Sequence, residues 1–232
     1  MRSLLKLIFP DFCLNCRVAT ESYGLCAECF KQIDFIGDNA CLKCGIEFAT
    51  KDNFEKICAA CIKEPAAFDS HISCVAYKSV IAKIIIDYKY HDQQIFHQFL
   101  VNLLIQKVRL FKNDFELISP IPMHWRKLFS RDFNQSDYLA KSLANSESKQ
   151  FCRALVKSKN TAPQMTLGLK ERQKNLKGAI EFNQQQDIKG KSILLIDDVY
   201  TTGSTLNECA KILKKNGATK VLCLTIARTL KN

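Results

Sequence analysis

Strand-like and helix-like patterns of apolar positions alternate along most of the chain. Residues 192–196 form a short, β-branched apolar run without a polar face, which is typical of a strand covered on both sides in a parallel sheet. Apolar positions at helical spacing then predict a helix over residues 206–216, ended by Gly217. The other expected strands are residues 73–77, 115–118, 151–157 and 220–227, and the other expected helices are residues 80–86, 95–108 and 135–143. This order predicts an α/β domain with a parallel sheet.

Two adjacent carboxylates, Asp197 and Asp198, directly follow the central apolar run. The hydroxyl-rich loop after them contains Thr201, Thr202, Gly203, Ser204 and Thr205. Backbone N–H groups at the start of the next helix can hold a phosphate, and glycine lets the backbone approach it closely. Because like charges repel, we expect the acid pair to accept hydrogen bonds from hydroxyls, such as those of a ribose. The stretch therefore predicts a ribose 5-phosphate site; the alternative is a strand that ends in an acidic turn with a Ser or Thr helix cap.

A loop rich in basic residues follows the expected strand at 115–118. It contains Arg126 and Arg131, and an arginine offers two parallel hydrogen bonds to a phosphate. Loops at the carboxyl ends of parallel strands collect ligands, so we expect this loop to face the same crevice as the acid pair. A polar, basic segment at 160–178 contains Arg172, and we expect it to be mobile and to close over the ligand. The alternative for the first loop is a solvent-exposed basic surface.

Eight of the twelve cysteines form four Cys-x-x-Cys pairs near the start of the chain. Two such pairs complete a tetrahedral Zn²⁺ site with no open position, so the expected role is structural or partner-binding, with the metal supplying folding energy. Sequential pairing would place one Zn²⁺ on Cys13, Cys16, Cys26 and Cys29, and another on Cys41, Cys44, Cys58 and Cys61. The alternatives are a cross-braced pairing, a disulfide framework and an iron–sulfur cluster.

Charge is unevenly divided over the 232 residues, which carry a net charge of +11. Residues 1–66 hold 8 Lys and Arg against 9 Asp and Glu, whereas residues 67–232 hold 26 against 14. Glu64-Pro65 ends the cysteine-rich module, so we expect domains at 1–66 and 67–232, and the basic second part favours phosphorylated ligands or nucleic acid. The apolar run at 4–9 contains Lys6 and is too short to span a bilayer, and no secretory cleavage site follows it. We therefore expect a cytoplasmic protein without a membrane span.

The stretch Asp-Asp-Val-Tyr-Thr-Thr-Gly-Ser-Thr at 197–205 resembles the phosphoribosyl pyrophosphate (PRPP) motif of type I phosphoribosyltransferases. Together with Pro-Ile-Pro-Met-His at 120–124, Arg-Asp-Phe-Asn-Gln at 131–135 and the segment 163–179, the chain resembles the ComF family of competence-associated proteins, also called GntX-like. That family joins an N-terminal zinc ribbon to a type I phosphoribosyltransferase domain. Where it usually has glycine, this chain has Asp132, whose negative charge disfavours the usual binding of pyrophosphate.

The resemblance implies a parallel-sheet type I phosphoribosyltransferase-like domain with a small N-terminal zinc-ribbon module. According to this resemblance, Asp197 and Asp198 would hold the ribose hydroxyls, and residues 201–205 would bind the 5-phosphate. Mg²⁺ would bridge ribose and pyrophosphate. The resemblance further implies a role in natural transformation, in which DNA is taken up with a helicase-like partner.

Two functions are compatible with these residues. The first is an enzyme that transfers ribose 5-phosphate from PRPP, in which Arg126, Arg131 or Arg172 and Mg²⁺ stabilise the departing pyrophosphate. No residue is a convincing general base for an acceptor nucleobase. The second is a non-catalytic module of the DNA import machinery that binds a ligand or single-stranded DNA.

Overall fold

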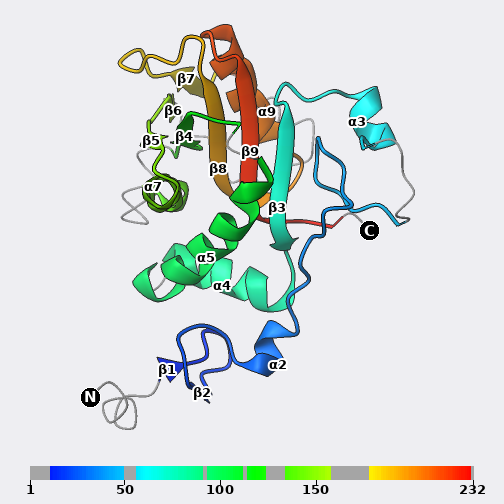
Figure 1. The fold of residues 1–232 in the computed structure, drawn as a ribbon, viewed down its shortest axis with the longest axis vertical. Coiled ribbons are helices and arrows are strands. Elements are labelled where there is room, and N and C mark those ends of the chain that lie inside the picture. Colours follow the sequence, from blue (N-terminus) through cyan, green and yellow to red (C-terminus); the bar gives the residue numbers. More distant parts are fainter. Residues whose placement is uncertain are drawn as a thin grey trace.

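A five-stranded parallel sheet forms the centre of the computed structural model, which describes residues 11–49, 56–90, 93–111, 114–123, 134–157 and 178–230 (Figure 1). The strands lie in the order β3-β9-β8-β4-β5, and each neighbouring pair is parallel. Their bounds are Ser70–Ala76 for β3, Leu117–Pro120 for β4, Gln150–Phe151 for β5, Ser192–Tyr200 for β8 and Lys220–Arg228 for β9. The predicted α/β class with a parallel sheet is confirmed.

Helices cover both faces of the sheet, as the apolar run in β8 predicts. Ile193 and Leu195 of β8 belong to the core that contains the buried face of α9. Leu194 and Ile196, which point the other way, belong to the core formed with α4, α5 and α7. The bounds of these helices are Ser79–Tyr90 for α4, Gln93–Val108 for α5, Gln135–Ser146 for α7 and Ser204–Lys215 for α9. A 3₁₀ turn, η1 (Arg109–Phe111), follows α5.

The cysteine-rich segments pack on the domain at two separate places. The first consists of β1 (Asp11–Phe12), β2 (Ala19–Thr20) and α2 (Ala27–Phe30), and it lies beside α4 and α5 in Figure 1. Its Leu14 and Ile33 are buried in the same core as α4. The second contains α3 (Ala59–Lys63), drawn on the other side of β3, and its Cys44 packs against the core of α9. Each segment therefore shares its apolar contacts with the domain.

Two predicted strands differ from the observed ones by more than a shift of two or three residues at their ends. The strand expected at 192–196 continues to Tyr200, because β9 runs on to Arg228 and pairs with it over this whole length. The strand expected at 151–157 is two strands, β5 and β6 (Leu155–Lys157). β5 pairs with β4, but the chain then turns away from the central sheet. β6 pairs antiparallel with β7 (Ile180–Phe182) in a separate two-stranded sheet. Among the described helices, none combines the length and apolarity that a membrane span requires.

Candidate functional site

Asp197 and Asp198 lie near the carboxyl end of β8, beside the start of α7. The Oδ1 atom of Asp197 accepts hydrogen bonds from the Ser136 hydroxyl and from the backbone amide of Asp198, each 3.0 Å long. Burial raises the pKa of Asp197 to about 7, and the negative charge of Asp198 acts in the same direction. Asp197 therefore changes its charge near neutral pH, far above the usual range of a carboxyl group.

Lys89, at the end of α4, contacts the acid pair directly. Its ammonium group forms an ion pair with Oδ2 of Asp198, and 22% of the Lys89 side chain and 16% of the Asp198 side chain are exposed. Although burial favours the neutral amine, the Asp198 carboxylate raises the pKa of Lys89. No sequence motif marks Lys89, because only the packing of α4 into the core brings it here. The one signal for it was the polar, aromatic end, residues 87–92, of an otherwise apolar segment.

The loop after β8 leads directly into α9. Gly203 precedes the first helical residue and has a φ of +75°, a left-handed conformation that favours glycine. Gly203 has no side chain to cap α9, and the Thr202 hydroxyl accepts from the backbone amide of Ser204 at 3.4 Å. The hydroxyls of Thr202 and Ser204 are hydrogen-bonded to each other at 2.9 Å. A helix N-terminus with hydroxyl groups around it favours an anion, such as a phosphate.

A cavity of about 350 Å³ joins the acid pair to this loop. Six of the seven predicted ligand residues line it, all except Thr202. Lys89, Tyr77 and Thr229 line it as well, although no sequence motif marked them. This volume is within the range of small-molecule sites. The carboxylates of the acid pair, which accept hydrogen bonds, line one part of the cavity, and the N-terminus of α9 lines another. This arrangement can hold a small molecule that has both hydroxyl groups and a phosphate.

The three predicted arginines, Arg126, Arg131 and Arg172, lie outside the described residues. The chain that enters and leaves the first arginine loop is described. The backbone amide of Ile121 donates to the carbonyl of Ile196 at 3.0 Å. At the other end, the side chain of Asn134 donates to the carbonyl of Ile121 at 3.2 Å. Both ends of this loop therefore lie at the carboxyl edge of the sheet, next to the acid pair.

Buried polar side chains connect the cavity to the second cysteine segment. Tyr200 lines the cavity, and its ring stacks on His71 with 4.2 Å between the ring centroids. The Arg228 guanidinium lies 5.3 Å from the centroid of the Tyr200 ring. His71 donates through Nδ1 to the carbonyl of Cys44 at 3.1 Å, and Arg228 donates to the same oxygen. Burial lowers the pKa of His71 to about 3, so the ring is neutral and its Nε2 accepts from buried hydroxyls of β3 and β9.

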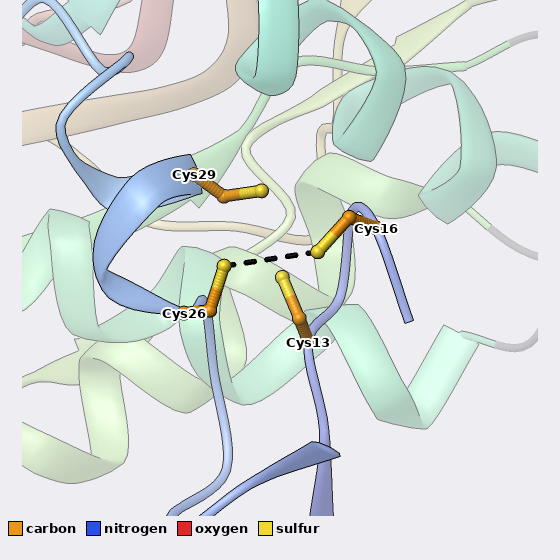
Figure 2. Close-up of side chains that lie close together, drawn as sticks. All are labelled: Cys13, Cys16, Cys26 and Cys29. Atoms are coloured by element: carbon orange, nitrogen blue, oxygen red, sulfur yellow. Dashed lines mark hydrogen bonds between the residues drawn. The ribbon is translucent and has the colours of Figure 1, made fainter. Parts of the chain in front are cut away.

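Eight cysteines gather into two groups of four in the sequential arrangement. Figure 2 shows the first group, in which all four sulfur atoms point toward one centre. Within each group the Sγ atoms all lie within 4.8 Å of one another. The groups are Cys13, Cys16, Cys26 and Cys29, and Cys41, Cys44, Cys58 and Cys61. All twelve cysteines of the chain are described and are free thiols, so no disulfide framework is present.

Both groups fit a structural Zn²⁺ ion. Zn–S bonds of about 2.3 Å in a tetrahedron place neighbouring sulfur atoms about 3.8 Å apart. The Sγ atoms of Cys16 and Cys26 are 3.7 Å apart, and so are those of Cys44 and Cys58. Backbone and amide groups also donate to the sulfurs: the amide of Cys58 reaches Cys41 at 3.2 Å. Such donors stabilise thiolates and orient them for a metal.

Comparisons with known proteins agree with these two parts of the structure. A family model described as a double zinc ribbon domain matches residues 4–62, and one described as a phosphoribosyl transferase domain matches residues 136–231. Competence protein F of Haemophilus influenzae is 30% identical over 225 residues, which cover 93% of this chain and 96% of that protein. DNA utilization protein YhgH of Escherichia coli is 29% identical over 232 residues, which cover 97% of this chain and 100% of that protein.

A solved purine phosphoribosyltransferase from Pyrococcus horikoshii is 18% identical, with a TM-score of 0.38, and the match covers 57% of this chain and 82% of that one. A likeness of this size carries no argument about function. The sheet, the matched domains and the two cysteine groups define the class: a phosphoribosyltransferase-type α/β domain with an N-terminal double zinc ribbon. The chain belongs to the competence protein F (ComF) family.

Proposed function

We propose that the protein binds PRPP or a related ribose 5-phosphate ligand in the cavity at the carboxyl end of β8. One observation carries this proposal: the acid pair and the start of α9 line the same cavity of about 350 Å³. Asp197 and Asp198 would accept hydrogen bonds from the ribose 2′ and 3′ hydroxyls. The amides and hydroxyls of residues 201–205 would donate to the 5-phosphate.

The reaction we propose for this site is phosphoribosyl transfer, with pyrophosphate as the leaving group. Arg126, Arg131 and Arg172 are proposed to stabilise the pyrophosphate. Mg²⁺ bound with the pyrophosphate would neutralise part of its charge. The acid pair would hold the ribose in place while positive charge develops at its anomeric carbon. The family model for a phosphoribosyl transferase domain supports this reaction, because its match includes all seven proposed ligand residues of this site.

A non-catalytic binding function is the second candidate. It is favoured by the lining of the cavity: among the described residues its acidic side chains are Asp197 and Asp198, which are assigned to the ribose, and it contains no histidine or glutamate to act on an acceptor base. The basic second part of the chain, with 26 Lys and Arg against 14 Asp and Glu, favours single-stranded DNA as the other ligand. Such binding would weaken steeply as the salt concentration rises, and DNA binding without salt dependence would rule it out.

For the cellular role we propose DNA uptake in natural transformation, in the cytoplasm and together with a helicase-like competence protein. The names of the relatives, a competence protein and a DNA utilization protein, support this role. The two cysteine groups are proposed to hold one structural Zn²⁺ each. The ribbon, proposed as residues 1–66, would face the protein partner, since it holds slightly more acidic than basic residues.

Calorimetric titration with PRPP and with ribose 5-phosphate tests the ligand. We expect saturable binding to the wild-type protein, and a loss of about tenfold or more when Asp197→Asn and Asp198→Asn are combined. A matched control removes two exposed carboxylates of the same domain, by Asp114→Asn and Asp187→Asn, and changes the net charge equally. Binding that is absent from the wild type, or equal in both double variants, would overturn the proposal.

A further inference from the structure

Lys89 is held in the cavity by its surroundings and does not extend freely from the surface. Its backbone carbonyl accepts a hydrogen bond of 3.4 Å from Gln135, which is buried at the start of α7. The preceding residue, Tyr88, is buried and hydrogen-bonds to His97 of α5 at 2.9 Å. The end of α4 is therefore fixed against two other helices. Lys89 extends from this anchored end to the Oδ2 atom of Asp198.

The charge balance of the cavity gives this lysine a specific importance. Among the described residues that line the cavity, Asp197 and Asp198 are the acidic side chains and Lys89 is the cationic one. A ribose 5-phosphate brings up to two further negative charges. Without a cation, two carboxylates and a phosphate would share one partly buried space, where like charges repel far more strongly than in water.

We propose that Lys89 is the resident counter-ion of the ligand site, so that the ribose 5-phosphate part of a ligand binds there without a divalent metal ion. In the free protein Lys89 neutralises Asp198. With the ligand bound, Lys89 continues to balance the acid pair, which accepts from the ribose hydroxyls with its remaining lone pairs. A divalent ion is then required only for the pyrophosphate of PRPP. This inference rests on the proposed function, because it concerns how the same site accepts its ligand.

Calorimetry with ribose 5-phosphate, in a chelator and in millimolar Mg²⁺, provides the first test. The wild-type protein should bind equally well in both buffers. Lys89→Met should bind about tenfold or more weakly in the chelator, and Mg²⁺ should restore much of the loss, since the metal ion replaces the missing charge. Lys89→Arg should behave like the wild type. The control Lys191→Met breaks an exposed ion pair with Glu116 elsewhere in the domain and should change nothing.

The outcomes separate this inference from the function on which it rests. If the wild type binds neither ribose 5-phosphate nor PRPP, the proposed function itself fails, and the inference fails with it. If the wild type binds ribose 5-phosphate only with Mg²⁺, the function stands and the resident counter-ion is refuted, whether or not the variants fold. Unchanged binding of Lys89→Met in the chelator refutes it as well, and so does a loss that Mg²⁺ does not restore.

A second measurement needs no sugar ligand. Mn²⁺ binding to the ligand-free protein, followed by electron paramagnetic resonance, should be at least about fivefold tighter for Lys89→Met than for the wild type. The reason is that removal of the ammonium group frees Asp198 for a metal ion. The gain should disappear when Asp198→Asn is added to Lys89→Met. Equal Mn²⁺ affinity of the wild type and Lys89→Met would contradict the proposal.

Discussion

Replacement of Asp197 by asparagine should stabilise the protein at alkaline pH while it removes ligand binding. Both hydrogen bonds that the Asp197 side chain accepts, from the Ser136 hydroxyl and the Asp198 amide, end on the single atom Oδ1. An asparagine can keep both through its amide oxygen, so the change removes a charge with little loss of contact. It also removes an acceptor that the proposed site needs for the ribose hydroxyls.

The size of the effect follows from the pKa of Asp197, which burial and the charge of Asp198 raise from the ordinary 3.8 to about 7. Below about pH 4 the carboxyl group is protonated in both the folded and the unfolded chain and has no effect on stability. As the pH rises from about 4 to about 7, the unfolded chain loses the proton first, so the wild type loses stability. Each unit of pKa corresponds to about 1.4 kcal/mol, which gives roughly 4 kcal/mol in full. Because Asp197 is only partly buried and solvent screening reduces the effect, we expect the advantage of Asp197→Asn to grow by about 1–3 kcal/mol between pH 5 and pH 8.

Urea unfolding of the wild type and of Asp197→Asn at pH 5 and pH 8 measures this difference directly. The comparison between two pH values cancels any constant effect of the substitution on packing. Calorimetry on the same samples should show at least about tenfold weaker binding of ribose 5-phosphate by Asp197→Asn at pH 8. A stability difference that is constant or shrinks from pH 5 to pH 8 would refute the assignment of a raised pKa to Asp197.

Three further predictions concern the loop and the ribbon. Gly203→Ala should cost more stability than Gly190→Ala, and only Gly203→Ala should weaken ligand binding. Both glycines have a φ of +75°, but an added Cβ atom would lie 2.5 Å from the Tyr200 hydroxyl oxygen only at Gly203. Chemical denaturation should show a loss of about 1 kcal/mol in the free energy of unfolding for Gly190→Ala. An equal loss for Gly203→Ala would contradict the close contact with Tyr200. Arg228→Met should lower the free energy of unfolding by about 1.5–3 kcal/mol, because it removes a charged donor to the Cys44 carbonyl. It should also speed zinc release in a chelator assay, and an unchanged rate of release would contradict a role of this hydrogen bond in holding the ribbon. Metal analysis should find two Zn²⁺ per chain, and their removal should lower the melting temperature; one ion or none would refute two structural sites.

The parts of the fold that follow from local pattern were predictable from the sequence. The apolar run in β8 predicts a strand buried on both faces, and Ile193 and Leu194 indeed enter opposite cores. The cysteine spacing predicts pairs of adjacent sulfurs, and the structure brings neighbouring pairs together. In both cases the residues that carry the signal lie within a few positions of one another in the sequence.

The features that depend on distant segments were not predictable. The acid pair lies inside a strand instead of after it, because β9 supplies backbone partners as far as Tyr200. Lys89 reaches Asp198 only because α4 is anchored on α5 and α7. The contact of His71 with the Cys44 carbonyl likewise joins a strand of the sheet to the ribbon. No spacing in the sequence encodes such contacts.

The most direct test of the proposed ligand site is a titration of isotope-labelled protein with ribose 5-phosphate, followed through its backbone amide NMR signals. We expect the signals of residues 201–205 and of Asp198 to shift together and to saturate with one dissociation constant. These shifts should be lost in the variant that combines Asp197→Asn and Asp198→Asn. The proposed site would be contradicted if saturating ligand left these signals in place or moved only signals elsewhere in the protein.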